Sequence, residues 1–198
     1  MITRDSMQPA IVRRTAFLLC GMAALQGALI LIFHDVFLTP LPANLAQVPP
    51  GAWILALAVA AAYVAYSAGA LPAVRKHLWN FSTFKLSGLA LAVPAAILEE
   101  VFFRQYVMDA LAHETAIIQI LASALTFGIA HAIWGIRGGW RAAAGAVGST
   151  TLMGAALAVV YLASGRAVLP CVVSHFLITA ILEPWLLYAY VERSRAAA

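Results

Sequence analysis

The sequence predicts an all-α protein, a polytopic bundle of about six transmembrane helices around a polar intramembrane cavity. The prediction depends on the apolar composition, the number of long apolar segments, and the ionisable residues inside some of these segments. Of 198 residues, 64% are hydrophobic and only 10% are charged, whereas soluble domains are about half apolar and about a quarter charged. The mean hydropathy is +0.92. The chain is therefore predicted to be an integral membrane protein, with residues 1–198 forming a single membrane domain.

Six segments are long and apolar enough to be predicted as membrane-crossing helices, which need about 20 such residues. In chain order they are 15–33, 52–71, 86–109, 115–135, 142–163 and 168–190. The first segment follows a basic stretch, as in a secretory signal. It is unusually long and no small-residue cleavage site follows it, so we expect it to be retained as a span.

Short stretches rich in helix-breaking residues separate the six segments. The proline-rich stretch 34–51 is predicted as a loop, and Leu71-Pro72 ends the second span. Residues 135–140 and 163–166, which contain glycines, are predicted as tight turns. Close packing between helices is expected at three glycines of the fifth span: Gly145, Gly148 and Gly154.

The distribution of lysine and arginine supports an even number of spans. One side of the six-span arrangement carries Arg4, Arg13, Arg14, Arg75, Lys76, Lys85, Arg137, Arg141, Arg193 and Arg195. Arg166 falls on the other side, and Arg104 lies inside the third span. Because cytoplasmic loops are enriched in these residues, both termini are predicted to be cytoplasmic. No basic run resembles a nucleic-acid-binding patch, so nucleic acid is excluded as a partner.

Three ionisable residues lie within six positions of the third span: Glu99, Glu100 and Arg104. A charge at bilayer depth costs several kcal/mol unless it is paired or faces a wet cavity, so such residues indicate a functional site. Glu100 and Arg104 are one helical turn apart and are predicted to form an ion pair. Glu99 has Phe103 at the equivalent position, so we expect its carboxylate to meet groups on other helices and to act as a general base.

Two further spans each carry one histidine, His131 in the fourth and His175 in the sixth. Together with Glu99, two imidazoles on separate helices can bind and activate a water molecule directly. The same three side chains can instead hold a divalent metal such as zinc that activates the water. Both alternatives lead to hydrolysis inside the membrane, and the residue types do not decide between them.

Three short motifs resemble those of the CPBP family, the CAAX-protease and bacteriocin-processing (Abi) intramembrane peptidases, which include the type II CAAX prenyl-protein endopeptidase. The motifs read Glu99-Glu100-x-x-x-Arg104, Phe127-x-x-x-His131 and His175-x-x-x-Thr179. They occur in the family's order and each lies on a separate predicted span, which makes the combination far more specific than any one motif. The resemblance covers roughly residues 86–182, which we take as the catalytic core.

The resemblance implies a role for each residue. Glu99 would activate water, His131 would help to hold it, His175 would stabilise the oxyanion, and Arg104 would balance charge. Thr179 stands where the family has Asn or Asp, and a hydroxyl reaches less far than an amide. The resemblance further implies that the substrate is a membrane-associated peptide or protein. The protein itself would lie in a lipid bilayer, in a bacterial inner membrane.

Other interpretations of these residues remain open. Because of Thr179, the chain could be a non-proteolytic family member that acts as a membrane binding, immunity or maturation partner. Cys171, one turn before His175, allows a thiol nucleophile, although a cysteine in an apolar helix usually only packs. Glu183 is interpreted as a residue near the cytoplasmic interface. A transporter that uses the same buried charges is a weaker alternative.

Straight, upright helices over the predicted ranges would not bring the candidate site together. Counting about 1.5 Å per residue, Glu99 would lie near mid-membrane, His131 closer to the cytoplasm and His175 closer to the outside. Convergence therefore requires tilted or bent helices, or spans that end elsewhere than predicted.

Overall fold

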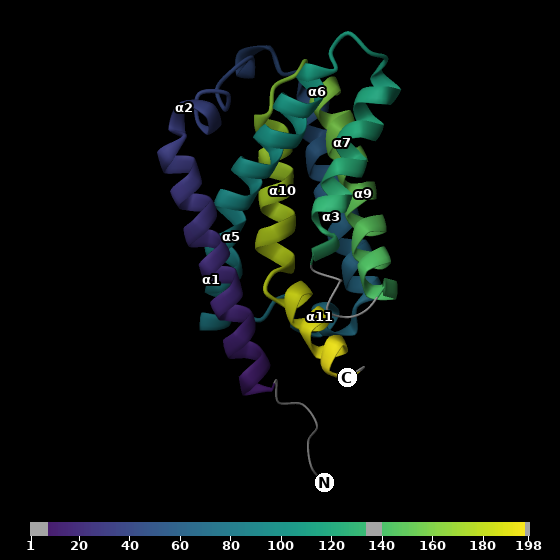
Figure 1. Cartoon of the computed structure of the whole chain (residues 1–198). Helices are drawn as coiled ribbons and strands as arrows, with labels where there is room; N and C mark the ends of the chain where they lie inside the picture. The colour runs from purple at the N-terminus through teal and green to yellow at the C-terminus, as the bar shows by residue number, and fades with distance from the viewer. Residues whose placement is uncertain (1–7, 134–139, 197–198) are drawn as a thin grey trace.

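The computed structural model describes residues 8–133 and 140–196, and every regular element in these ranges is a helix (Figure 1). The predicted all-α fold is therefore confirmed. The predicted turn at 135–140 and Arg137 lie largely outside the described residues.

The elements follow one another as a series of long helices joined by short ones. They are α1 (Pro9–Ile32), α2 (His34–Phe37), the 3-10 turn η1 (Leu45–Gln47), α3 (Pro50–Ala70), α4 (Pro72–His77), α5 (Thr83–Glu100), the π-helical segment η2 (Val101–Tyr106), α6 (Val107–Ala110), α7 (Ala116–Ala130), α9 (Trp140–Ala163), α10 (Leu169–Leu182) and α11 (Trp185–Ala196).

Four helical stretches of the described chain are long and apolar enough to cross a membrane: Pro9–Ile32, Pro50–Ala70, Thr83–Ala110 and Ala143–Ala163. Two shorter apolar helices, Ala116–Ala130 and Leu169–Leu182, correspond to the predicted fourth and sixth spans. The protein is thus a polytopic helical membrane protein. The described part of each predicted segment is mainly helical, and the sixth segment is divided into α10 and α11. Residues 134 and 135 of the fourth segment lie outside the described residues.

The sequence predicts that the sixth span continues to residue 190, and this predicted end is wrong. Helix α10 ends at Leu182, and Glu183 adopts an extended conformation with ψ of 145°. Pro184 explains this, because proline has no N–H to donate and disfavours a helical residue before it. Lys85 satisfies carbonyl groups of the broken end: its Nζ donates to the carbonyl oxygens of Ile181 and Glu183 at 2.6 and 2.7 Å.

Helix α10 lies in the middle of the bundle and contacts α3, α5 and α9, while α1 packs on α5 and α7 packs on α9 (Figure 1). The helices α7 and α9 approach closely because Gly128 and Gly154 carry no side chain. A Cβ atom on Gly128 would lie 2.0 Å from the Thr151 hydroxyl oxygen. Close packing was predicted correctly at Gly154, whereas Gly145 and Gly148 face open space.

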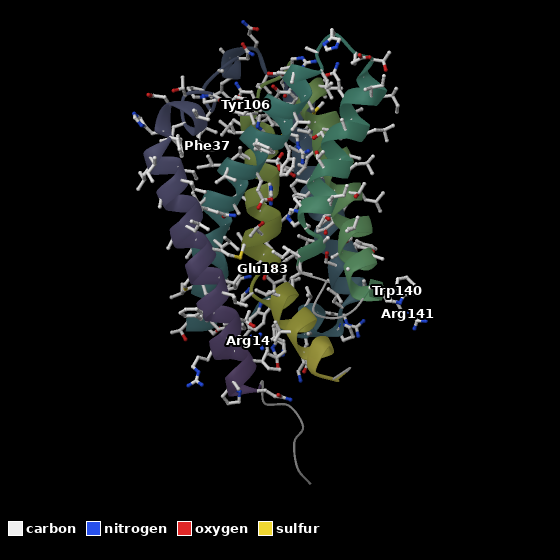
Figure 2. The ribbon with its side chains drawn as sticks, in the orientation of Figure 1. Arg14, Phe37, Tyr106, Trp140, Arg141 and Glu183 are labelled. Carbon is white, nitrogen blue, oxygen red and sulfur yellow. The ribbon has the colours of Figure 1, made fainter. Side chains whose placement is uncertain are left out.

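The start of α1 and the end of α11 lie at the same end of the bundle (Figure 1). Figure 2 places Arg14 and Arg141 in this half of the molecule, with Phe37 and Tyr106 near the opposite end. An even number of crossings requires this arrangement, which brings Arg14 of α1 and Arg141 of α9 to the same side.

Candidate active site

Glu100 and Arg104 form an ion pair in the interior of the bundle, as their spacing predicts. Arg104 donates from Nε to Glu100 Oε2 at 2.7 Å, and both side chains are fully buried. A second contact joins Arg104 Nη2 to Glu100 Oε1 at 3.4 Å. Glu100 is the last residue of α5 and Arg104 lies in η2, so the pair spans the point where the helix changes from α to π geometry. Such π-helical turns are frequent at functional sites.

Arg104 also ties this helix to α7. Its Nη1 donates to the hydroxyl of Ser123, which in turn donates to the carbonyl oxygen of Phe103 at 2.9 Å. The guanidinium lies 5.1 Å from the centre of the Phe127 ring, within the range of a cation–π contact. The buried charge is therefore held by a carboxylate, a hydroxyl and an aromatic face. Ser123 was not predicted from the sequence, because a single serine in an apolar helix does not by itself indicate a partner for a buried arginine.

His175 connects the ion pair to α10. Its Nδ1 lies 2.8 Å from Glu100 Oε1. Because an ionised carboxylate only accepts hydrogen bonds, Nδ1 carries a hydrogen and donates it. The ring consequently turns Nε2 toward Glu99, whose Oε2 is 4.0 Å away.

His131 is oriented in the same way by a different partner. It forms the C-cap of α7, and its Nδ1 lies 2.8 Å from the carbonyl oxygen of Phe127, one turn earlier. A carbonyl oxygen can only accept, so Nδ1 again carries the hydrogen. The other nitrogen, Nε2, lies 3.5 Å from Glu99 Oε2.

Glu99 is thus placed between two imidazole rings, as expected for a carboxylate without a partner on its own helix. Its Oε2 atom is buried and has no hydrogen-bond partner among the described residues. The side chain is 15% exposed, and the exposed part lines a cavity. A carboxylate oxygen and two imidazole Nε2 atoms therefore face one another at the cavity wall.

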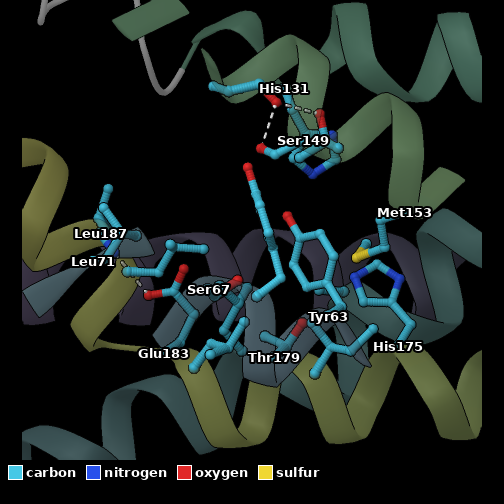
Figure 3. A pocket seen from close by; sticks show the side chains of 18 of the residues that line it. Tyr63, Ser67, Leu71, His131, Ser149, Met153, His175, Thr179, Glu183 and Leu187 are labelled. Carbon is cyan, nitrogen blue, oxygen red and sulfur yellow. Dashed lines mark hydrogen bonds between the residues drawn. The ribbon is translucent and has the colours of Figure 1, made fainter. Parts of the chain in front are cut away.

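This cavity has a volume of about 270 Å³ and lies inside the bundle. Residues of α1, α3, α5, α9, α10 and α11 line it. Figure 3 shows His175 and Thr179 on one wall, with Tyr63, Ser67, Ser149 and Met153 among the other lining residues. Thr179 lies one helical turn beyond His175, partly buried. The predicted cavity is present between the helices; its lining is mainly apolar, and Glu99, His131, His175 and Thr179 supply polar groups to it.

The thiol alternative is not favoured by the structure. Cys171 is fully buried, and its Sγ donates to the carbonyl oxygen of Leu157 on α9 at 3.3 Å. It is not among the residues that line the cavity. The thiol therefore points into packed helix and not toward His175 and the cavity.

A metal ion was the other open alternative at Glu99, His131 and His175. Carboxylate oxygen and imidazole nitrogen are donors that zinc accepts. Among the described residues, however, no group of three or more His, Cys, Asp or Glu side chains is arranged so that it could hold a metal ion. The donors have the chemistry that zinc accepts, so the metal alternative stays a prediction.

Glu183, interpreted from the sequence as a residue near the cytoplasmic interface, lies at the cavity as well. It stands between α10 and α11, and its side chain borders the same cavity as Glu99 (Figure 3). Tyr63 and Ser67 of α3 are further lining residues that sequence reasoning did not find. The sequence hardly indicates that they line a cavity, because they are single polar residues outside the three motifs.

The carboxylate–histidine cluster lies within a segment that matches a known family. The sequence profile described as type II CAAX prenyl endopeptidase Rce1-like matches residues 81–181. No curated protein and no solved structure matches the chain. The matched segment covers half of the chain and contains all three motifs. The chain therefore belongs to the Rce1-like family of type II CAAX prenyl endopeptidases, a family of membrane proteases.

Proposed function

We propose that the protein is an intramembrane endopeptidase in which Glu99 activates the attacking water. The observation that carries this proposal is the position of Glu99 Oε2, which has no hydrogen-bond partner among the described residues and lies 3.5 Å from His131 Nε2 and 4.0 Å from His175 Nε2. We place the attacking water at the cavity wall, beside the Glu99 carboxylate and the His131 imidazole, which both border the cavity. A general base must first lie within hydrogen-bond reach of the proton that it takes, and it must then be in its deprotonated form.

The reaction then follows from the positions of the protons. Glu99 takes a proton from the water as the water oxygen attacks the carbonyl carbon of the scissile peptide bond. His131 Nε2, which carries no hydrogen in the neutral ring, accepts the water's other hydrogen in a hydrogen bond and orients it. The protonated Glu99 next gives its proton to the leaving nitrogen, and the carbon–nitrogen bond breaks. The products are a carboxylic acid and an amine, so atoms and charge balance.

His175 is proposed to stabilise the oxyanion that forms during the attack. For this role its ring must be protonated on both nitrogens, so that Nε2–H can donate while Nδ1–H stays on Glu100. The Glu100 carboxylate lies 2.8 Å from Nδ1 and balances the charge of this imidazolium. Thr179, one turn further along α10, is proposed to add a hydroxyl donor. Removing one oxyanion donor typically lowers the rate by about 10²–10³-fold.

Glu100 and Arg104 are proposed to position the site without touching the substrate. Glu100 fixes the ring of His175, and Arg104 holds Glu100 and connects it to Ser123 on α7. We propose that the mechanism uses no metal ion, since no group of three metal-ligating side chains that could hold one is found among the described residues.

The substrate is proposed to be a peptide segment of a membrane-associated protein that enters the cavity within the bundle. We further propose that the protein resides in a bacterial inner membrane. The lysine and arginine distribution supports the proposal that both termini lie in the cytoplasm. The catalytic core corresponds to residues 86–182.

A cleavage assay with membrane peptides tests the proposal. The purified protein is reconstituted in liposomes with a panel of membrane-associated peptides, and products are identified by mass spectrometry. Wild type should release fragments that Glu99→Gln does not release. Glu114→Gln is the matched control, because Glu114 lies in the loop before α7 with its side chain 40% exposed. Fragments formed equally by Glu99→Gln would refute the assignment.

Thr179 favours one second candidate, a family member that binds partners without cleaving them. Thr179, four residues after His175, offers a hydroxyl where the family motif has the amide of Asn or the carboxyl group of Asp. This alternative predicts that the double variant His131→Ala, His175→Ala keeps its biological phenotype. The peptidase proposal predicts that the same variant loses it.

A further inference from the structure

A polar cluster at the end of the bundle opposite both termini takes no part in the proposed mechanism. It consists of Asp109 in α6, Gln119 in α7, Tyr161 in α9 and Arg166 in the turn between α9 and α10. Figure 1 shows α6 at this end, with the N- and C-termini at the other. None of the four side chains is among the described residues that line the cavity, so the cluster does not touch a substrate bound there.

Arg166 is the centre of this cluster. Its Nη1 forms an ion pair with Asp109 Oδ1, and its Nη2 donates to Gln119 Oε1 at 2.7 Å. Tyr161 donates its hydroxyl to the same carboxylate at 3.1 Å, and its ring centre lies 5.9 Å from the guanidinium carbon. The buried amide of Gln119 is oriented by its Nε2, which donates to the carbonyl oxygen of Glu114 at 2.8 Å. The guanidinium thus binds acceptors on two helices at once, which suits its planar fork of donors.

The backbone conformation at Arg166 is one that favours glycine. Both Gly165 and Arg166 have a φ of 66°, in the left-handed region that residues with a side chain seldom adopt. The Arg166 N–H donates to the Tyr161 carbonyl oxygen at 3.0 Å, and the Ser164 hydroxyl donates to that of Ala167 at 2.7 Å, so the turn is well held. A glycine would build the same turn without strain, which points to a task for the Arg166 side chain itself.

The cluster joins the three helices that carry the catalytic side chains. Asp109 lies in the continuous helical stretch that contains Glu99. Gln119 lies in α7, which ends at one catalytic histidine, and Arg166 is three residues before the start of α10, which carries the other. Each bond of the Arg166 guanidinium therefore links the start of α10 to one of the other two helices.

This link matters because α7 packs chiefly on α9. The spacing between His131 at the end of α7 and His175 in α10 therefore depends on side chains that bridge the helices. Arg104 supplies one bridge to α7, and Arg166 supplies a second one turn further from the site. Two attachment points fix the tilt of a rigid helix, whereas one point leaves it free to pivot.

We propose that Arg166 is a positioning residue that clamps α6 and α7 to the start of α10 and so sets the spacing of Glu99, His131 and His175. The inference rests on the proposed peptidase function, for which these three side chains must face one another. A misplacement of about 1 Å can cost about 10²-fold in rate, even when the altered residue is far from the chemistry. Because Arg166 does not line the cavity, its loss should lower kcat and leave KM close to the wild-type value.

Arg166→Gly separates positioning from folding. Glycine adopts the left-handed turn without strain, so relief of strain offsets the lost ion pair and the melting temperature should stay close to that of wild type. On the best cleaved peptide of the liposome panel, kcat per folded protein should fall by about 10–10²-fold, with KM within about twofold of wild type. Arg166→Lys keeps one charge for Asp109 and should lie between the two. Arg75→Met, at an exposed arginine of α4, is the matched control and should behave as wild type.

Two kinetic results would overturn the inference while leaving the peptidase proposal intact. One is a kcat of Arg166→Gly within about a factor of three of wild type. The other is a loss of kcat/KM that comes from KM alone, which would place Arg166 in substrate binding.

A distance measurement tests the clamp without turnover. Nitroxide labels are attached at Val93→Cys in α5, which packs on α10, and at Ile129→Cys in α7, both exposed positions. The exposed Cys20 is first changed by Cys20→Ser, and the buried Cys171 stays. The distance distribution from double electron–electron resonance should shift or broaden when Arg166→Gly is added, and superimposable distributions would overturn the inference. A changed distribution in a protein that cleaves no peptide would overturn the peptidase proposal alone.

Discussion

His175 donates a hydrogen from Nδ1 to Glu100 Oε1 across 2.8 Å and turns its other nitrogen toward Glu99. The second glutamate of the Glu-Glu pair therefore acts through the histidine of another helix, and the first glutamate faces the cavity. Glu100 in turn is held by Arg104 at 2.7 Å. One buried arrangement of three side chains thus sets the direction in which His175 presents Nε2.

Removing Glu100 should destabilise the protein as well as inactivate it. Glu100→Leu leaves the buried Arg104 charge unpaired, and breaking a buried pair in this way costs about 3–5 kcal/mol. The double variant Glu100→Leu, Arg104→Met removes both charges and should recover most of the lost stability without recovering activity, because His175 keeps no partner. Thermal unfolding in detergent and peptide cleavage measure the two effects. Recovery of cleavage in the double variant would contradict the positioning role of Glu100.

The hydroxyl of Thr179 should contribute to the rate and not to substrate binding. Thr179→Val keeps the shape of the side chain and removes the donor, so kcat should fall by about 10²-fold while KM changes little. Thr179→Asn introduces the amide of the family motif and should not be slower than wild type. Steady-state kinetics on one peptide check both. Unchanged kcat in Thr179→Val would remove Thr179 from the oxyanion site.

Chelators should leave cleavage unchanged if the mechanism is the proposed one. In the proposed mechanism Glu99 and His131 activate water without a metal ion, so neither EDTA nor 1,10-phenanthroline should lower kcat. Initial rates before and after overnight dialysis against each chelator provide the measurement. A loss of activity that zinc restores would show that the metal alternative is correct.

Gly128 should be intolerant of a side chain, because α7 and α9 meet there. A Cβ atom would lie 2.0 Å from the Thr151 hydroxyl oxygen and 2.9 Å from the Val147 carbonyl oxygen. Gly128→Ala should therefore destabilise the protein by about 1–3 kcal/mol, as overpacking usually does. Gly148→Ala is the matched control, since nothing lies within 4 Å of its Cβ position. Equal melting temperatures for the two variants would contradict the packing described here.

The sequence predicted the class of fold and most residues of the site, because both depend on local patterns. Apolar length identifies membrane helices, and the spacing of Glu100 and Arg104 identifies their ion pair. The convergence of Glu99 with His131 and His175 was less accessible, because it depends on where helices end. Helix α7 ends at Ala130 and His131 is its C-cap, whereas residues 134 and 135 of the predicted fourth span lie outside the described residues.

Residues outside the motifs were not predictable in the same way. Ser123 and Glu183 acquire their roles only from tertiary neighbours, Arg104 in one case and the cavity in the other. The close packing at Gly128 likewise depends on Thr151 of α9. No local pattern distinguishes these residues from ordinary serines, glutamates and glycines of membrane helices.

The catalytic rate of Glu99→Gln is the measurement that tests the central claim most directly. The variant keeps the size of the side chain and removes the carboxylate that faces His131 Nε2 at 3.5 Å. With a melting temperature equal to that of wild type, its kcat on the best cleaved peptide should fall by about 10²–10⁴-fold, the usual contribution of a general base. A kcat within a factor of three of wild type would contradict the role of Glu99 as the base that activates water.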